Sequence, residues 1–283
     1  MTQLESKTIE SNQKQWFYRQ ASPRNKSEAS PVVFLHGLLA HSYSWRILLE
    51  DIAETGLMAY APDWLGEGSS AKPSSREFAY TPNAYIAALE ELLAALNLER
   101  FHLVVQGFVG SVGLQYAFRH PEQIERLVIL NAPLSSSVRL PWLMRQWAFP
   151  LMGEMLTQDP LLVDRTLEKG SGYVISDENL GVYRQPFLKN SQAGRSLVAT
   201  IKNLNLPQAM KEVEVGWKDW DKPTQIIWGM GDPWLSADVP ETLAKDYKNI
   251  RLAKLEDGKH YPQEHCSEEI SPILLTFLRQ QTG

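Results

Sequence analysis

The chain has 283 residues, with 28 Lys and Arg against 33 Asp and Glu and a formal net charge of -5. This length allows two small domains or one large α/β domain with an insertion. Nucleic acid is not an expected partner, because no segment carries the dense basic cluster that neutralises phosphates. The apolar runs are far shorter than the ~20 residues that cross a bilayer, and the polar start lacks the apolar segment of a signal peptide. We therefore expect a soluble, cytoplasmic protein without a transmembrane segment.

The cysteine content excludes two kinds of stabilisation. Cys266 is the single cysteine, so neither an intramolecular disulfide nor a Cys-rich zinc site can form. The fold must then be held by its core, for which 43% hydrophobic residues are enough. Metal-ligand clusters and phosphate-binding glycine loops are also absent from the sequence, so we expect no metal and no cofactor.

The first half of the chain alternates strand and helix patterns. Short continuous apolar runs such as Val32–Leu35 are typical of strands buried on both faces of a parallel sheet. Between them, apolar residues recur three and four apart, as in helices. The predicted strands are 9–20, 32–36, 58–62, 101–105 and 127–130, and the predicted helices are 83–96 and 110–120, with a loop over 22–30. This alternation indicates βαβ units.

The pattern changes between Pro133 and about Asp221, where the sequence is irregular, aromatic and interrupted by prolines. We interpret this segment as an inserted helical cap, in which Trp142, Trp147, Trp217 and Trp220 either line a cavity or fill a core. The alternation then resumes with strands at 224–228 and 251–255 and helices at 237–246 and 267–280. We therefore divide the chain into a core, residues 1–133 and 222–283, and a cap, residues 134–221.

Four loops that follow predicted strands carry distinctive sequences. They are HGLL at 36–39, PDWLGEGS at 62–69, WGMGDP at 228–233 and GKHYP at 258–262. Together, in this order and over nearly the whole chain, they resemble the α/β-hydrolase superfamily. With FRHPE at 118–122, the most similar branch is that of haloalkane dehalogenases, epoxide hydrolases and short-acyl esterases. The resemblance implies an α/β-hydrolase fold, a mostly parallel central sheet flanked by helices, with the segment at 134–221 as its helical cap.

The resemblance also implies a set of site residues. The family's chemistry uses a nucleophile on a sharp strand-to-helix turn, a late Asp, a later His and an oxyanion hole of two backbone N–H groups. Asp232 and His260 match the acid and the base, and Leu38 and Phe108 would supply the oxyanion-hole N–H groups. His36 and Gly37 open the oxyanion-loop motif. In the structural alternative, Asp232 caps the following helix and His260 is a buried polar residue.

The nucleophile position departs from the family pattern. Aligning residues 103–110 with the family's strand, turn and helix places Gly107 where a Ser, Asp or Cys stands. Glycine relaxes the backbone strain of about 1–3 kcal/mol that a side chain bears there, but it cannot attack a substrate. Ser111 is the nearest hydroxyl, about one helical turn beyond the elbow. Gly107, Phe108 and Leu38 also replace the Asp, Trp and Asn or Trp that dehalogenation uses.

Three functional hypotheses remain. In the first, an enzyme acts on a small apolar molecule and the Asp232–His260 dyad activates water or a substrate proton. In the second, a non-catalytic protein binds a hydrophobic ligand or a protein partner, with Trp142, Trp147, Phe149, Phe187 and Trp234 as candidate contacts. In the third, Ser111 acts as an unorthodox nucleophile. We interpret Cys266, Asp63, His41, His102, His120 and His265 as structural. The sequence does not indicate which substrate is used, whether the protein is catalytically active, or what its oligomeric state is.

Overall fold

The structure is a computed structural model that describes residues 3–25, 27, 29–149, 152–157, 159 and 161–280. These residues form an eight-stranded sheet in the order β1-β2-β4-β3-β5-β6-β7-β8. The strands are β1 (Gln3–Ser11), β2 (Lys14–Ser22), β3 (Val32–Leu35), β4 (Ala59–Pro62), β5 (Phe101–Gln106), β6 (Ile124–Leu130), β7 (Thr224–Gly229) and β8 (Ile250–Leu255). β1 pairs antiparallel with β2 and β2 with β4, whereas the pairs from β4 to β8 are parallel. The predicted mostly parallel sheet is confirmed.

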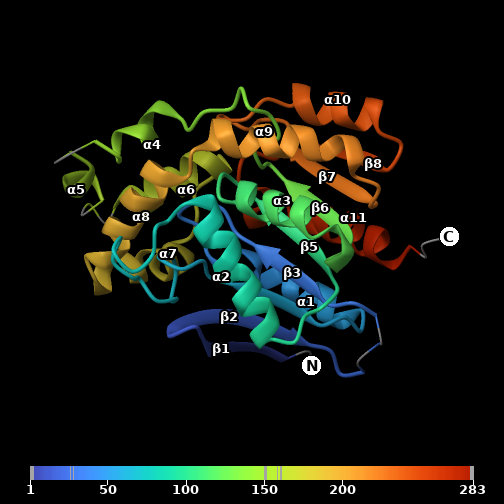
Figure 1. Ribbon diagram of the computed structural model, residues 1–283, viewed down its shortest axis with the longest axis horizontal. Helices are drawn as coiled ribbons and strands as arrows, with labels where there is room; N and C mark the ends of the chain where they lie inside the picture. The colour runs from blue at the N-terminus through green and yellow to red at the C-terminus, as the bar shows by residue number, and fades with distance from the viewer. Residues whose placement is uncertain are drawn as a thin grey trace.

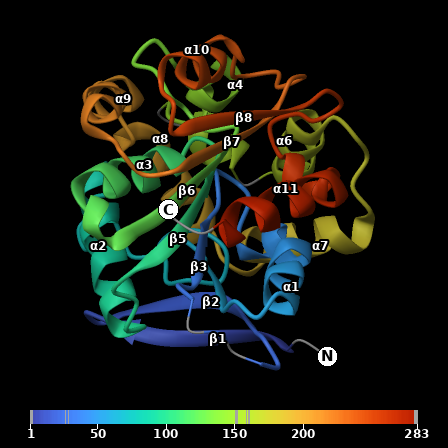
Figure 2. The ribbon, with the colours of Figure 1, turned by 90° about the vertical axis from the view of Figure 1, so that its right-hand side faces the viewer.

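Helices cover both faces of the sheet (Figure 2). They are α1 (Arg46–Glu54), α2 (Pro82–Ala95), α3 (Gly110–Arg119), α4 (Trp142–Gln146), α5 (Met152–Leu156), α6 (Leu161–Ser171), α7 (Asp177–Lys189), α8 (Gln192–Asn203), α9 (Leu206–Gly216), α10 (Asp238–Asp246) and α11 (Ser267–Arg279). α1 and α11 lie on one face, where Trp45, Leu49 and Ile270 share a buried apolar cluster with strand residues. α2 and α3 lie on the other face and pack into the larger cluster.

The N-terminal strand prediction was wrong in one respect. Residues 9–20 were expected to form one strand, but β1 and β2 form a hairpin that reverses at Asn12 and Gln13. Both turn residues have positive φ, 46° and 60°, the conformation of a tight hairpin turn whose twist matches that of the flanking strands. Asn favours this conformation, whereas Gln13 gives no such signal. Polar residues alternate along β1, so it has no continuous apolar run, and its pairing with β2 was not predicted.

The segment between β6 and β7 is helical among its described residues, as predicted. It contains α4 to α9, and α4 to α8 lie together at one end of the molecule, beyond the body of the sheet (Figure 1). α9 lies beside α3, and Arg119 on α3 bonds Glu212 on α9 through two nitrogens. In this segment Trp147, Trp217 and Trp220 are buried and fill the core, while Trp142 is 58% exposed.

No helix in the described part of the chain combines the length and apolar character that a bilayer crossing requires.

Candidate active site

The predicted site residues lie at one edge of the sheet, where the parallel strands end. Gly107 directly follows β5, Asp232 lies three residues after β7, and His260 lies in the loop that follows β8. Leu38 lies in the loop after β3. In open α/β sheets the carboxyl ends of the strands form the crevice where ligands bind. The fold therefore brings together four segments that are far apart in the sequence.

His260 and Asp232 form a buried hydrogen-bonded pair. Nδ1 of His260 lies 2.8 Å from Oδ2 of Asp232, and both side chains are at most 1% exposed. The other oxygen of Asp232, Oδ1, accepts hydrogen bonds from the backbone N–H groups of Trp234 at 2.8 Å and Leu235 at 3.1 Å. The aspartate thus performs the turn-capping role of the structural alternative and also orients the imidazole. Its catalytic role stays a prediction.

Asn131 is a member of this cluster that the sequence analysis missed. Its Nδ2 donates to Oδ2 of Asp232 at 2.8 Å and to the Gly229 carbonyl at 3.1 Å, and its Oδ1 accepts from the Gly229 N–H. Asn131 has a positive φ of 39°, a conformation in which Asn is enriched. Asn131 therefore joins the end of β6 to the end of β7. It binds Oδ2 of Asp232, whereas the turn-capping bonds of Asp232 go to Oδ1.

The turn after β5 has the backbone of a strained elbow. Gly107 has a φ of +69°, and α3 begins three residues later. A Cβ atom placed on Gly107 would lie 3.5 Å from Nε2 of His260 and 2.8 Å from Cα of Gly37. That Nε2 is buried and has no hydrogen-bond partner in the described part of the structure. The free imidazole nitrogen therefore faces the position where a side chain at residue 107 would begin.

Gln106 connects the elbow to the two loops around it and was also missed by the sequence analysis. Its Oε1 accepts from the Gly37 N–H at 3.2 Å, and its Nε2 donates to the His260 carbonyl at 2.7 Å. The side chain is fully buried. A glutamine at the end of the apolar run of β5 is the signal that could have identified it, since a buried amide needs partners. One side chain thus spans the loops after β3 and β8.

The two predicted oxyanion-hole donors are free. Among the described residues, the backbone N–H groups of Leu38 and Phe108 donate no hydrogen bond to another protein group. The loop that carries Leu38 is held by Tyr261, whose hydroxyl donates to the Leu38 carbonyl at 2.9 Å. Burial raises the pKa of Tyr261, so this hydroxyl keeps its proton at neutral pH. Two unpaired N–H groups beside the elbow can stabilise negative charge that develops on a bound oxygen.

Aromatic rings enclose the imidazole of His260. Phe108 stacks on it with ring centroids 5.0 Å apart, and Trp234 and Tyr261 contact it edge to face at 4.7 and 4.9 Å. Trp234 was expected among the apolar ligand contacts, and it lies here rather than on a cap helix. This shell shields the ring from bulk solvent and strengthens the electrostatic interactions inside it.

The remaining candidates lie elsewhere. Ser111 is buried within α3, and its hydroxyl donates to the Phe108 carbonyl at 2.7 Å. Cys266 is buried at the start of α11, where burial raises the pKa of its thiol to about 11. His102 is buried in β5, which lowers its pKa to about 4. His120 contacts Glu90 at 2.8 Å, and His265 packs on Tyr173.

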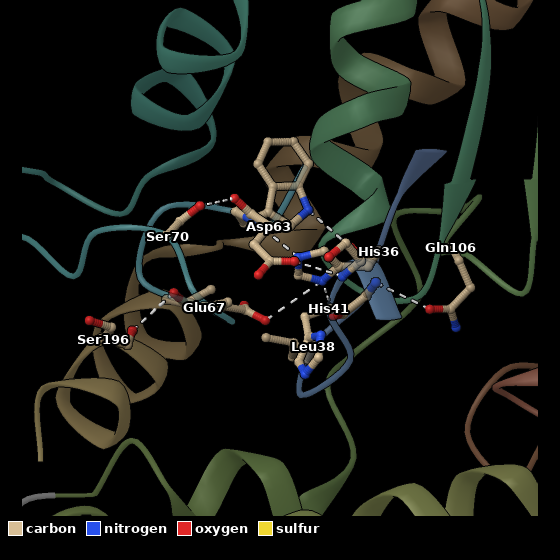
Figure 3. Close-up of polar contacts among 12 residues, drawn as sticks. His36, Leu38, His41, Asp63, Glu67, Ser70, Gln106 and Ser196 are labelled. Atoms are coloured by element: carbon tan, nitrogen blue, oxygen red, sulfur yellow. Dashed lines mark hydrogen bonds and ion pairs between the residues drawn. The ribbon is translucent and has the colours of Figure 1, made fainter. Parts of the chain in front are cut away.

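His36 and Asp63 lock the loop after β3 to the loop after β4 (Figure 3). The His36 Nδ1 lies 2.8 Å from the Gly37 carbonyl, and its Nε2 accepts from the Trp64 N–H at 3.0 Å. Asp63 accepts from the backbone N–H groups of Ser42 and Ser69, each at 2.7 Å. Burial lowers the pKa of His36 to about 4. Both side chains therefore hold loops in place, as expected for Asp63.

Glu67 lies beside this pair, and its carboxyl faces the backbone N–H of Leu39 (Figure 3). Its carboxyl is buried, its Oε1 has no hydrogen bond in the described structure, and its Oε2 lies 3.9 Å from Nδ1 of His36. Burial, together with the negative charge of Asp63, raises the pKa of Glu67 to about 8. Glu67 therefore keeps its proton to a higher pH than a solvent-exposed glutamate does. The PDWLGEGS motif places Glu67 in a loop but gives no indication of its burial.

Comparisons with known proteins agree with this architecture. The model of a family described as alpha/beta hydrolase fold matches residues 30–265. A cis-3-alkyl-4-alkyloxetan-2-one decarboxylase from Shewanella oneidensis is 29% identical, over 90% of this chain and 84% of its own length. A haloalkane dehalogenase from Mycobacterium marinum is 30% identical, over 89% and 85%. The crystal structure of a haloalkane dehalogenase from Bradyrhizobium elkani superimposes with a TM-score of 0.85 at 23% identity, covering 98% of both chains.

Replacing the Gln106 side chain by an apolar one of similar size should destabilise the protein. In Gln106→Met, the Gly37 N–H and the His260 carbonyl lose their partners while still buried, which costs about 2–4 kcal/mol in the free energy of unfolding. Urea denaturation measures this loss. Gln208→Met, at an exposed position of α9, is the matched control and should change stability by less than about 0.5 kcal/mol. Equal stability of the two variants would contradict the bridging role.

The buried acid Glu67 should make stability depend on pH. Its pKa is raised from 4.5 to about 8 in the folded state, so between these values the folded protein holds a proton that the unfolded chain has lost. The stability contributed by this proton therefore falls as pH rises from about 4.5 to 8, by at most about 5 kcal/mol. Denaturant titrations at several pH values give the free energy of unfolding of wild type and of Glu67→Gln. Because both proteins contain His36 and His102, the pH dependence that these histidines cause cancels in the difference between the two. A difference that is constant with pH would show that Glu67 titrates normally.

Proposed function

Because the chain belongs to the alpha/beta hydrolase fold family, we propose that it is an enzyme that acts on a small apolar molecule by general-base catalysis. The Asp232–His260 dyad activates a water molecule or a substrate proton, and no covalent nucleophile takes part at Gly107. The observation that carries the proposal is the free Nε2 of His260, which faces the side-chain position of residue 107 at 3.5 Å. We further propose residues 134–221 as the cap over a core of residues 1–133 and 222–283.

The proposed reaction balances without a covalent intermediate. A water oxygen attacks the substrate's carbonyl carbon while Nε2 of His260 accepts the water proton. The carbonyl oxygen becomes an oxyanion, which the N–H groups of Leu38 and Phe108 stabilise. As the oxyanion collapses, the bond to the leaving group breaks and the imidazolium returns its proton to that group. Asp232 stabilises the charged imidazolium throughout and remains ionised.

The proposed substrate class is a small apolar ester or lactone. One relative is named for an alkyl-substituted oxetan-2-one, which is a cyclic ester, and the oxyanion hole suits a carbonyl substrate. Dehalogenation is not proposed, although other relatives carry that name. Displacing a halide in one step needs a carboxylate at the elbow, and Gly107 provides none. Leu38 and Phe108 also have no side-chain N–H group for a halide ion.

A second candidate function is non-catalytic binding of a hydrophobic ligand or a protein partner. The observation that favours it is the glycine itself, because the chain retains the elbow backbone and the two free N–H groups without a nucleophile. The two candidates differ in what His260 does. In an enzyme it is essential for turnover, and in a binding protein it only packs against the rings of Phe108, Trp234 and Tyr261.

Removing the base should abolish turnover. With a panel of small esters, lactones, thioesters and epoxides, we expect wild-type activity that falls by about 10²–10⁴ in His260→Ala. Asp232→Asn should cause a similar loss, since it removes the charge that stabilises the imidazolium. Initial rates under identical conditions measure the effect, and His120→Ala is the control at a surface histidine. Unchanged rates in His260→Ala would overturn the proposal.

Adding a hydroxyl at the elbow separates the candidates further. A Cβ at residue 107 would lie 2.8 Å from Cα of Gly37, so any substitution must displace that loop, and Gly107→Ala controls for the crowding. We expect a fluorophosphonate probe to add mass to Gly107→Ser but not to wild type or Gly107→Ala. Labelling of wild type at Ser111 would restore the third hypothesis. Ester turnover that appears only in Gly107→Ser would support the binding protein instead.

A further inference from the structure

Strand β1 lies at the outer edge of the sheet and pairs on one side only among the described strands. β2 is its single neighbour in the sheet order, and β1 lies at the bottom of the sheet in Figure 2. The whole length of β1 pairs with β2 without a register shift, and the strand contains no proline. A long, regular edge strand offers a row of unpaired backbone groups to another strand.

The hairpin turn decides which backbone groups of β1 point outward. In a hairpin with a two-residue loop, the residues that flank the loop, here Ser11 and Lys14, exchange hydrogen bonds. The odd-numbered residues of β1 therefore bond to β2, and the even-numbered residues point their N–H and C=O groups away from it. Phe17, which lies opposite Thr8, agrees with this alternation, because its carbonyl accepts from the Asp63 N–H at 2.9 Å on the other side of β2.

The outward backbone groups of β1 are free. They belong to Leu4, Ser6, Thr8 and Glu10, and no other described residue forms a hydrogen bond with them. Around a two-fold axis, an edge strand can pair antiparallel with its own copy, since each chain then offers the same donors and acceptors to the other. A second copy of the chain can therefore extend the sheet at β1.

The charged side chains of β1 favour one register for such a pair. Glu5 and Lys7 lie on the same face of the strand, with Oε2 and Nζ 2.7 Å apart. When Ser6 lies opposite Ser6 of the second copy, each Glu5 lies opposite the other copy's Lys7, at a position where the Cα atoms are about 4.5 Å apart. The four charges then alternate in sign along and across the strands, which is favourable. Centring the pair on Lys7 would oppose two lysines, and centring it on Thr8 would leave these charges without opposite charges across the interface.

We propose that β1 is a dimerisation surface that pairs antiparallel with β1 of a second copy of this chain, with Ser6 opposite Ser6. The eight-stranded sheets of the two copies then form one continuous sheet. A second copy fits better than a strand of another protein, because the charges of β1 are complementary to themselves. The proposal is independent of the proposed function, since β1 contributes no residue to the His260 site.

Sedimentation equilibrium of the full chain tests the pairing. In wild type we expect a reversible monomer–dimer equilibrium. Ser6→Pro should abolish the dimer, because proline removes the N–H group at the centre of the interface but no hydrogen bond to β2. Ser6→Ala is the matched control and should keep the dissociation constant within threefold of wild type. A monomeric wild type, or a dimer that persists in Ser6→Pro, would overturn the proposal.

Charge reversals test the register. In Lys7→Glu, and separately in Glu5→Lys, like charges oppose each other across the interface, so the dissociation constant should rise about tenfold. The double variant Glu5→Lys/Lys7→Glu restores opposite charges and should return to within threefold of wild type. Lys218→Glu makes the same charge change at an exposed residue outside β1 and should have no effect. Near-UV circular dichroism checks that each variant is folded. Equal dissociation constants in all of these variants would contradict the charge pairing.

A cysteine at the two-fold axis gives a second readout of the register. Ser6→Cys should form an intermolecular disulfide on mild oxidation, because the two Cα atoms of residue 6 are about 5.5 Å apart in the proposed pair. Thr8→Cys should not, since residue 8 lies opposite Leu4 of the second copy. Wild type is the control, because its single cysteine, Cys266, is buried. A disulfide that forms in Thr8→Cys but not in Ser6→Cys would overturn the proposal.

Discussion

The site depends on the close approach of two glycine backbones, Gly37 after β3 and Gly107 after β5. A Cβ atom on Gly37 would lie 2.9 Å from Cα of Gly107, and one on Gly107 would lie 2.8 Å from Cα of Gly37. Gln106 bonds across this contact to Gly37 and to the His260 carbonyl. Because three loops meet within one contact, the free N–H groups beside the elbow and the imidazole keep fixed relative positions.

The same contact leaves little room for a side chain at residue 107. An elbow in a family of covalent enzymes is usually strained by its side chain, and the glycine here removes that strain while keeping the left-handed backbone. Asp232 and Asn131 orient His260 through bonds that do not involve residue 107. The contacts that orient His260 are therefore independent of the side chain at residue 107.

Helices α7 and α8 contribute a different kind of interaction, since they cover polar side chains of the loops after β3 and β4. Glu67 lies under α7 and α8, where burial raises its pKa to about 8. Predicting this from the sequence was not possible, because the PDWLGEGS loop gives the position of Glu67 but not its covering. His41, interpreted as an ordinary polar residue, lies under the same helices. Neither side chain's environment can be derived from its neighbours in the chain.

The sequence by itself determined the order of strands from β3 onward, the helices α2, α3, α10 and α11, the helical character of the segment between β6 and β7, and the loops that carry Asp232 and His260, because buried parallel strands and helices have local apolar periods. It missed helix α1 and the β1–β2 turn, where Gln13 gives no turn signal. Only the tertiary structure decided the polar contacts. Gln106 and His260 are 154 residues apart, and Asn131 and Asp232 are 101 apart. Such pairs leave no local sequence pattern, because the two polar residues come close only in the folded sheet.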